Sequence, residues 1–234
     1  MKYLRSVFCQ LAISFVFITL VSCINKVNTT VETHTPNDTT KHYLALGDSY
    51  TIGQSVSPLD RFPEQLVRLL RAKNILVIDP DIVATTGWTT GNLIQSLENT
   101  PPKNNYSLVT LLIGVNNQYQ GRSISEYRTE FQYLLNRAIL YAGNNKRNVF
   151  VLSIPDYSVT PFAANSDTAR IAREIDEFNL VNKEISQQLE VRWLDITPIS
   201  REAKTDRTLL ANDGLHPSSS QYSLWVEKLS QLIN

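Results

Sequence analysis

Five short apolar runs, separated by longer segments with a helical pattern, constrain the fold of this chain most strongly. They are Tyr43 to Leu46, a part of residues 75–84, Leu108 to Ile113, Val149 to Ile154 and Val191 to Leu194. Within the runs the apolar residues are continuous rather than alternating. Such runs are typical of strands buried on both faces, as in a parallel sheet.

Apolar side chains recur at helical spacing between these runs. The helical faces are Tyr127, Phe131, Leu134, Leu135, Ala138 and Ala142; Ile171, Ile175, Phe178, Ile185 and Leu189; and Tyr222, Trp225, Val226, Leu229 and Ile233. Pro63 is suited to begin another helix, which carries Leu66, Leu69 and Leu70. The repeated strand–helix order predicts a three-layer α/β/α sandwich with a central, mostly parallel five-stranded sheet. Right-handed crossovers then place helices on both faces.

The N-terminal residues 1–22 have the pattern of an export signal. Lys2 and Arg5 precede the almost entirely apolar segment Leu11 to Val21. That segment is shorter than the roughly 20 residues of a membrane-spanning helix. Leu20-Val21-Ser22-Cys23 resembles the lipobox of bacterial lipoproteins, which implies cleavage before Cys23 and lipidation of its thiol. An uncleaved anchor and an ordinary secretory signal are the alternatives.

The lipobox resemblance implies a domain held at the bacterial cell envelope, facing the periplasm or the exterior. Residues 23–42 would be the lipidated cysteine and a flexible tether, because they are polar and lack apolar periodicity. Residues 43–234 would form one domain. The only other cysteine, Cys9, lies in the signal, so no internal disulfide is expected. With 22 basic and 22 acidic residues and no basic stripe, nucleic acid is not an expected partner.

Polar motifs follow four of the predicted strands. They are Gly47-Asp48-Ser49, Thr86-Gly87-Trp88, Gly114-Val115-Asn116-Asn117 and Pro155-Asp156-Tyr157. Ligands bind outside the carboxyl ends of the strands in open α/β sheets. We therefore expect these motifs to meet at one rim of the sheet.

A serine and a histidine are the candidate nucleophile and base. Ser49 lies at a strand-to-helix junction, but a hydroxyl needs a base to become nucleophilic. Of the three histidines, His34 lies in the tether and His42 at the amino end of the first strand, which leaves His216. Asp213, three residues earlier, would orient the imidazole. The alternatives are a helix-capping serine and a loop histidine held by local bonds.

Hydrolysis of an ester also needs donors for the oxyanion of the transition state. The candidates are the backbone N–H groups of Ser49 and Gly87 and the side-chain amide of Asn116. Gly87 permits close backbone approach and unusual φ values. The alternatives are a simple turn glycine and a strand-end cap.

In their order along the chain, these motifs resemble the conserved blocks of the SGNH/GDSL hydrolase family. Gly47 to Tyr50 resembles the first block, with Ser49 as nucleophile, and Gly87 matches the second. Gly114-Val115-Asn116 matches the third, and Asp213 to His216 matches the fifth. The resemblance implies a flavodoxin-like sheet, an open active site, and ester hydrolysis without a metal or cofactor.

Asn117 departs from the family pattern, which usually has Asp at this position. The family residue generally has a supporting role, so the departure implies altered loop bonding with catalysis retained.

Two functions follow from the sequence. The first is a serine ester hydrolase that acts through an acyl-enzyme on an O-acetyl carbohydrate, a short-chain acyl ester or a lysophospholipid. The second is a non-catalytic envelope-anchored binding module on the same fold. We expect Trp88, Tyr119 and residues 155–164 to line the cleft, and Arg61 to meet an anionic group or a structural carboxylate.

Overall fold

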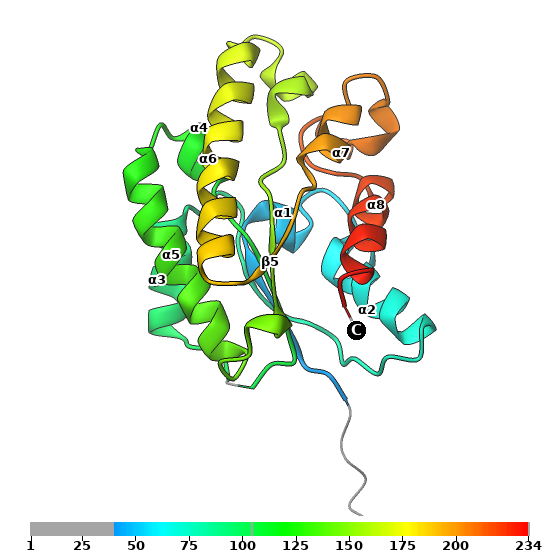
Figure 1. Ribbon diagram of the computed structural model, residues 1–234. Coiled ribbons are helices and arrows are strands. Elements are labelled where there is room, and N and C mark those ends of the chain that lie inside the picture. Colours follow the sequence, from blue (N-terminus) through cyan, green and yellow to red (C-terminus); the bar gives the residue numbers. More distant parts are fainter. Residues whose placement is uncertain (1–39, 104, 234) are drawn as a thin grey trace, which may run out of the picture. The chain divides into compact units, whose positions relative to one another are not determined.

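A computed structural model describes residues 40–103 and 105–233 of the chain. The export signal, Cys23 and His34 lie outside the described residues, as does most of the tether. Figure 1 shows the described part coloured along the sequence.

The described residues form a five-stranded parallel sheet with the strand order β2-β1-β3-β4-β5. The strands are β1 (Tyr43–Gly47), β2 (Asp81–Ala84), β3 (Leu108–Leu112), β4 (Val149–Leu152) and β5 (Arg192–Leu194). This order is the flavodoxin-like one, in which the chain reverses direction across the sheet between β1 and β3. The predicted five-stranded α/β fold is therefore confirmed.

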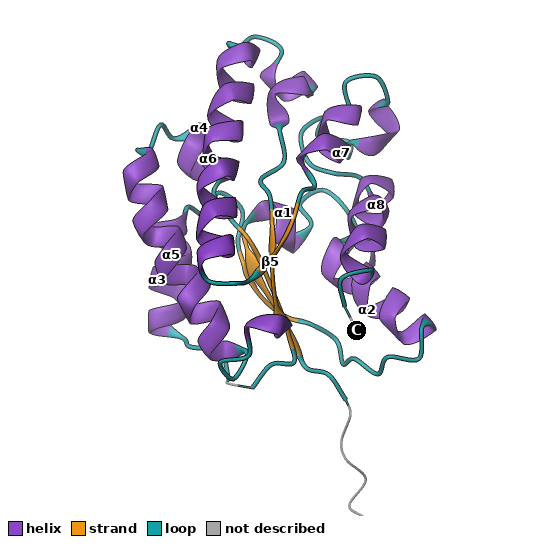
Figure 2. Cartoon of the chain, viewed as in Figure 1, coloured by secondary structure: helices purple, strands orange, loops and turns teal. Residues whose placement is uncertain are grey.

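Helices cover both faces of the sheet (Figure 2). The α-helices are α1 (Ser49–Ile52), α2 (Phe62–Ala72), α3 (Thr90–Asn99), α4 (Val115–Tyr119), α5 (Ile124–Tyr141), α6 (Thr168–Gln188), α7 (Thr197–Glu202) and α8 (Ser219–Ser230). Short 3-10 helices are η1 (Pro58–Asp60), η2 (Lys146–Asn148), η3 (Tyr157–Val159), η4 (Pro161–Ala163) and η5 (Arg207–Leu209). Helices α3, α5 and α6 lie on one face, and α2 and α8 pack together on the other.

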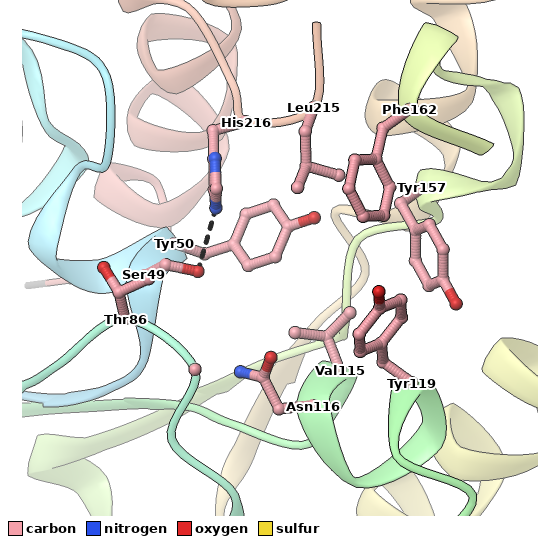
Figure 3. A pocket seen from close by; sticks show the side chains of 11 residues that line it. Ser49, Tyr50, Thr86, Val115, Asn116, Tyr119, Tyr157, Phe162, Leu215 and His216 are labelled. Carbon is pink, nitrogen blue, oxygen red and sulfur yellow. Dashed lines mark hydrogen bonds between the residues drawn. The ribbon is translucent and has the colours of Figure 1, made fainter. Parts of the chain in front are cut away.

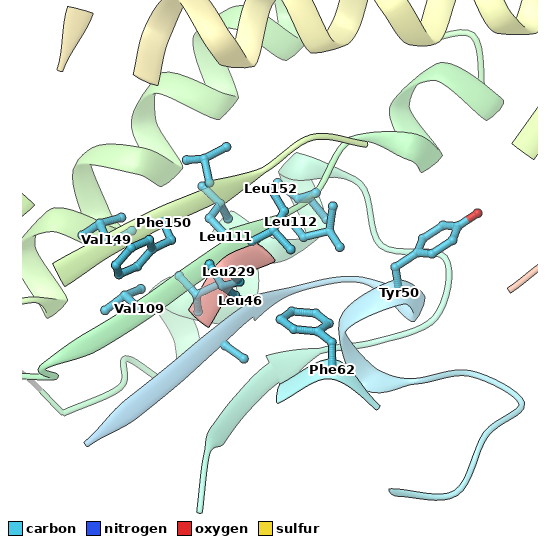
Figure 4. Close-up of a cluster of buried hydrophobic side chains, with 14 of the residues drawn as sticks. Leu46, Tyr50, Phe62, Val109, Leu111, Leu112, Val149, Phe150, Leu152 and Leu229 are labelled. Atoms are coloured by element: carbon cyan, nitrogen blue, oxygen red, sulfur yellow. The ribbon is translucent and has the colours of Figure 1, made fainter. Parts of the chain in front are cut away.

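Burial explains why the strands read as continuous apolar runs. Every residue of β1, β3 and β4 is buried, because helices cover the sheet on both sides. Figure 4 shows side chains of these strands packed together with Phe62 of α2 and Leu229 of α8. The edge strands β2 and β5 are only partly buried, which accounts for their weaker apolar patterns.

A buried amide extends the hydrogen bonding of β4 beyond its last residue. The backbone N–H of Ile154 donates to Asn179 Oδ1 at 2.6 Å. Asn179 Nδ2 in turn donates to the Ile154 carbonyl at 3.0 Å. The side chain of α6 thus satisfies the backbone as a neighbouring strand would. It fixes the direction in which the chain enters the 155–163 loop.

Gly47 permits a close approach between the end of β1 and its surroundings. A Cβ atom on this residue would lie 2.1 Å from Thr51 Oγ1 and 2.4 Å from the carbonyl oxygen of Leu112. The second of these atoms belongs to the backbone of β3, which cannot move aside without disturbing the sheet. Only glycine therefore allows α1 to start directly at the carboxyl end of β1.

We predict that Gly47→Ala lowers the free energy of unfolding by about 3 kcal/mol, because the added methyl group overpacks the sheet end. Urea unfolding measures the change. Gly121→Ala is the control for backbone strain alone, since Gly121 carries a positive φ of 67°, which Gly47 does not, and has no atom within 4 Å of the added methyl group. The control should cost only about 1–2 kcal/mol. Equal losses in the two variants would contradict the packing argument.

Candidate active site

A pocket of about 130 Å³ opens at the carboxyl ends of β1 and β3, where the sheet order reverses. Figure 3 shows the side chains that surround it. Its lining residues are Ser49, Tyr50, Thr86, Gly87, Val115, Asn116, Tyr119, Tyr157, Phe162, Leu215 and His216. All four predicted rim motifs contribute to this lining, the fourth through Tyr157. The expected meeting of the motifs at one rim is therefore observed.

Ser49 is the first residue of α1 and is 4% exposed. Asp48 caps this short helix by accepting a hydrogen bond from the Tyr50 N–H at 3.0 Å. Because Asp48 caps α1, the Ser49 hydroxyl is not needed as a helix cap, and its side chain points into the pocket. Ser49 Oγ lies 2.9 Å from His216 Nε2, which is hydrogen-bonding distance.

Asp213 holds His216 through both its ring and its backbone. Asp213 Oδ2 lies 2.6 Å from His216 Nδ1. The other carboxylate oxygen, Oδ1, accepts from the N–H groups of Leu215 and His216 at 2.9 and 3.0 Å. The structure thus brings together Ser49, His216 and Asp213 in the order of a nucleophile, a base and an orienting carboxylate. His42 is exposed at the amino end of β1, away from the pocket.

Ser55 is a member of this arrangement that the sequence analysis missed. Its hydroxyl donates to Asp213 Oδ2 at 2.6 Å from a loop that follows α1. Partial burial raises the pKa of Asp213, but hydrogen bonds from Ser55, His216 and Leu215 outweigh it and hold the pKa at about 2. The carboxylate therefore stays charged and oriented over the neutral pH range. No sequence signal indicated this contact, because its partners are 158 positions apart.

The predicted oxyanion donors also line the pocket. Gly87 adopts a φ of 82°, which favours glycine even though a Cβ atom would meet nothing within 4 Å. Asn116 Nδ2 donates to the carbonyl of Trp88 at 2.9 Å. This bond fixes the plane of the amide beside the loop that carries Gly87. In Figure 3 the amide nitrogen of Asn116 lies on the Ser49 side of the side chain.

Three aromatic side chains form the opposite side of the pocket. The ring centroids of Tyr119, Tyr157 and Phe162 lie 5.9–6.2 Å from one another. Tyr157 is buried, whereas Tyr119 and Phe162 are 58% and 49% exposed. We call these three residues the aromatic wall. The wall and its neighbours Val115 and Leu215 make this side of the pocket apolar.

One expectation about the cleft needs revision, and one of the two alternatives for Arg61 is confirmed. Trp88 is not among the residues that line the pocket; its side chain packs against the hydrophobic core, and its carbonyl accepts a hydrogen bond from Asn116. Arg61 meets a structural carboxylate, since its Nη2 donates to Glu64 Oε1 at 2.8 Å. No Asp, Glu, Lys or Arg side chain lines the pocket among the described residues. The described residues likewise contain no cluster of three or more candidate metal ligands.

Asp48 is a buried acid directly beside Ser49. It is 1% exposed, and its Oδ2 has no hydrogen-bond partner among the described residues. Burial raises the pKa of this carboxyl to about 7, against the opposing effect of the Tyr50 N–H. The folded state therefore favours the protonated form of Asp48.

Both the sequence and the fold of this chain are similar to those of known proteins. The model of the GDSL-like Lipase/Acylhydrolase family matches residues 45–224. No curated protein matches the sequence. Solved structures share the fold, among them the psychrotrophic esterase EstA from Pseudoalteromonas sp., with 18% identity, a TM-score of 0.60 and coverage of 84% of this chain and 97% of that one.

Two further structures show the same likeness. The lipase/acylhydrolase from Enterococcus faecalis has 19% identity and a TM-score of 0.62, with coverage of 82% of this chain and 95% of that one. The acetylxylan esterase Axe2 from Geobacillus stearothermophilus has 19% identity and a TM-score of 0.62, with coverage of 83% and 94%. At these identities the structural matches show the fold.

The burial of Asp48 predicts a pH-dependent stability. Its pKa is about 7 in the folded chain against an ordinary value of 3.8, so the folded state binds the extra proton between these values. The stability should therefore fall by roughly 1–3 kcal/mol as the pH rises through this window. Asp48→Asn should lack this part of the pH dependence. Urea unfolding of both proteins from pH 4 to pH 8 tests the prediction, and parallel stability curves would contradict it.

Proposed function

We propose that this chain, which belongs to the GDSL-like lipase/acylhydrolase family, is a serine ester hydrolase that acts through an acyl-enzyme on Ser49. One observation carries the proposal. Ser49 Oγ, His216 and Asp213 are linked by distances of 2.9 and 2.6 Å, and Ser49 and His216 line a pocket large enough for a small acyl group. The three side chains supply a nucleophile, a base and the group that orients the base.

The acylation step follows from this geometry. Ser49 Oγ attacks the ester carbonyl carbon while His216 Nε2 takes the hydroxyl proton. Asp213 stabilises the resulting imidazolium and keeps Nε2 directed at the pocket. The tetrahedral intermediate then collapses, the carbon–oxygen bond to the alcohol breaks, and His216 returns its proton to the leaving oxygen.

Deacylation repeats the sequence with water. His216 takes a proton from the water as it attacks the acyl carbonyl, and then returns it to Ser49 Oγ as the acid is released. In both steps the negative charge develops on the carbonyl oxygen. We assign its stabilisation to the Ser49 and Gly87 N–H groups and to the Asn116 amide, which line the same pocket.

The size and chemistry of the pocket support a small, neutral acyl ester as substrate. Its volume of about 130 Å³ is close to the roughly 150 Å³ of an apolar cavity that holds benzene. An acyl group of up to about six carbons would fit within it on this scale. The aromatic wall leaves two exposed rings at the pocket for the rest of the substrate, which suits an alcohol with a stacking face, such as an acetylated sugar.

Replacement of the nucleophile tests the reaction. We expect Ser49→Ala to lower kcat for a short-chain p-nitrophenyl ester by at least about a thousandfold, because the acyl-enzyme can no longer form. Labelling by a fluorophosphonate should disappear in the same variant. Ser57→Ala is the matched control, because Ser57 is exposed and its side chain makes no capping hydrogen bond to η1. Full activity of Ser49→Ala would disprove the mechanism, and an unlabelled wild-type protein would favour a non-catalytic binding module.

The same assay distinguishes the substrate classes. Acetyl, butyryl and hexanoyl esters should be hydrolysed more efficiently than octanoyl and longer esters, because longer chains extend beyond the pocket. An acetylated xylose oligomer and a lysophospholipid complete the series. Preference for the lysophospholipid would contradict a small acyl group.

We further propose that the domain is anchored to the bacterial cell envelope by a lipid on Cys23. The lipobox-like sequence supports this anchor. Among the residues that the structure describes, no helix is long and apolar enough to cross a membrane.

Metabolic labelling with a fatty-acid analogue tests the anchor. The wild-type chain should carry the label and sediment with the membranes, whereas Cys23→Ser should lose both properties because the thiol is absent. Cys9→Ser is the matched control and should retain the label. A labelled Cys23→Ser chain would refute the proposal.

A further inference from the structure

The side chain of Asn117 links the two loops that carry the proposed oxyanion donors. Asn117 lies in α4 directly after Asn116, and it is completely buried. Its side chain contacts Thr90, the first residue of α3, which follows the Gly87 loop. No part of the proposed reaction uses Asn117 directly.

Every hydrogen bond in this contact has a defined direction. The Thr90 N–H donates to Asn117 Oδ1 at 2.9 Å, which fixes which end of the amide carries the nitrogen. Asn117 Nδ2 then donates to Thr90 Oγ1 at 2.6 Å. The Thr90 hydroxyl uses its single proton to donate to Glu130 Oε2. The chain of donors therefore runs from Asn117 through Thr90 to Glu130.

Glu130 is the terminal acceptor and belongs to α5. Its carboxylate reaches the amino end of α3, where a negative charge is favoured by the helix dipole. Gly91 leaves room for it, since a Cβ atom there would lie 3.2 Å from Glu130 Oε1. Glu130 forms no ion pair with any described residue. The Thr90 hydroxyl is therefore an important partner of this carboxylate.

We propose that Asn117 is a positioning residue for the oxyanion donors and that Asn117 and Glu130 form a matched pair joined by Thr90. The proposal rests on the proposed function. A carboxylate at position 117 would still accept from the Thr90 N–H. It could not donate to Thr90 Oγ1, so two carboxylates would compete for one hydroxyl proton. The amide at 117 is thus the form that fits an acid at 130.

The pair acts on the site together with a second hydrogen bond between the same two loops. Asn116 donates to the carbonyl of Trp88, and Asn117 holds Thr90 two residues further along the same loop. Together they fix the spacing between Gly87 and the Asn116 amide. A change in that spacing weakens contacts made to the oxyanion more than contacts made to the bound ester. The effect should therefore appear in kcat rather than in KM.

The test is a double-mutant cycle in the full chain, assayed with a short-chain ester that the wild type hydrolyses through Ser49. Asn117→Asp should lower kcat by about tenfold, a part of the effect of losing one oxyanion donor, with KM changed less than twofold. Glu130→Gln alone should cost less, because a glutamine oxygen still accepts from Thr90. Asn117→Asp/Glu130→Gln should recover kcat to within about threefold of the wild type, because the donors now run in the opposite direction.

The control is Asn136→Asp, which makes the same charge change at an exposed position of α5 and should leave kcat and the melting temperature unchanged.

Unchanged kcat in Asn117→Asp would overturn the positioning role, and a double variant no better than Asn117→Asp would overturn the pairing. If Asn117→Asp fails to fold, a folded and active double variant supports the pairing and an unfolded one overturns it. Absence of Ser49-dependent hydrolysis in the wild type would contradict the proposed function instead. The melting temperatures of the wild type, the two single variants and the double variant would still measure the coupling between Asn117 and Glu130.

Discussion

The contact between Gly47 and the end of β3 is the constraint on which the site depends. Gly47 has no side chain, so the backbone of Leu112 and the side chain of Thr51 can lie close to its Cα. For this reason α1 can begin immediately at the end of the central strand β1. Ser49 therefore appears at the reversal point of the sheet instead of one turn further into solvent. The position of the proposed nucleophile is thus a consequence of sheet packing, and the surrounding loops are built to meet it.

The loops around Ser49 are fixed mainly by bonds between distant segments. Thr86 donates to Gln54 at 2.6 Å and joins the β2 loop to the loop after α1. Ser55, in that same loop, donates to Asp213 in the loop that carries Asp213 and His216, called here the histidine loop. Asn117 joins the loops after β2 and β3. Each loop is therefore oriented by its neighbours, and the geometry of the donors is a property of the whole rim.

The parts of this structure that sequence predicts are those with a local physical cause. The strands β1, β3 and β4 are buried on both faces, so their runs are apolar from end to end. Periodic apolar faces predict helices α5, α6 and α8, but α3 buries only Thr90, Leu93 and Leu97 and gives no comparable periodicity. The role of Ser55 has no sequence signal for a different reason. Its hydroxyl acts through a hydrogen bond to Asp213, which lies in a different loop.

Ring packing holds the aromatic wall, whereas hydrogen bonds hold Asp213 and His216. Substrate specificity can therefore vary separately from the geometry of these two residues. Tyr119 and Phe162 contact one another mainly through their rings and remain half exposed, so packing imposes few demands on their identity. The wall is nevertheless attached to the histidine loop, because the Phe162 N–H donates to the carbonyl of Gly214 at 3.3 Å. That bond uses the backbone alone. Substitutions in the side chains of the wall would therefore change the surface offered to a substrate, while the backbone bond continues to hold the loop of Asp213 and His216 in place.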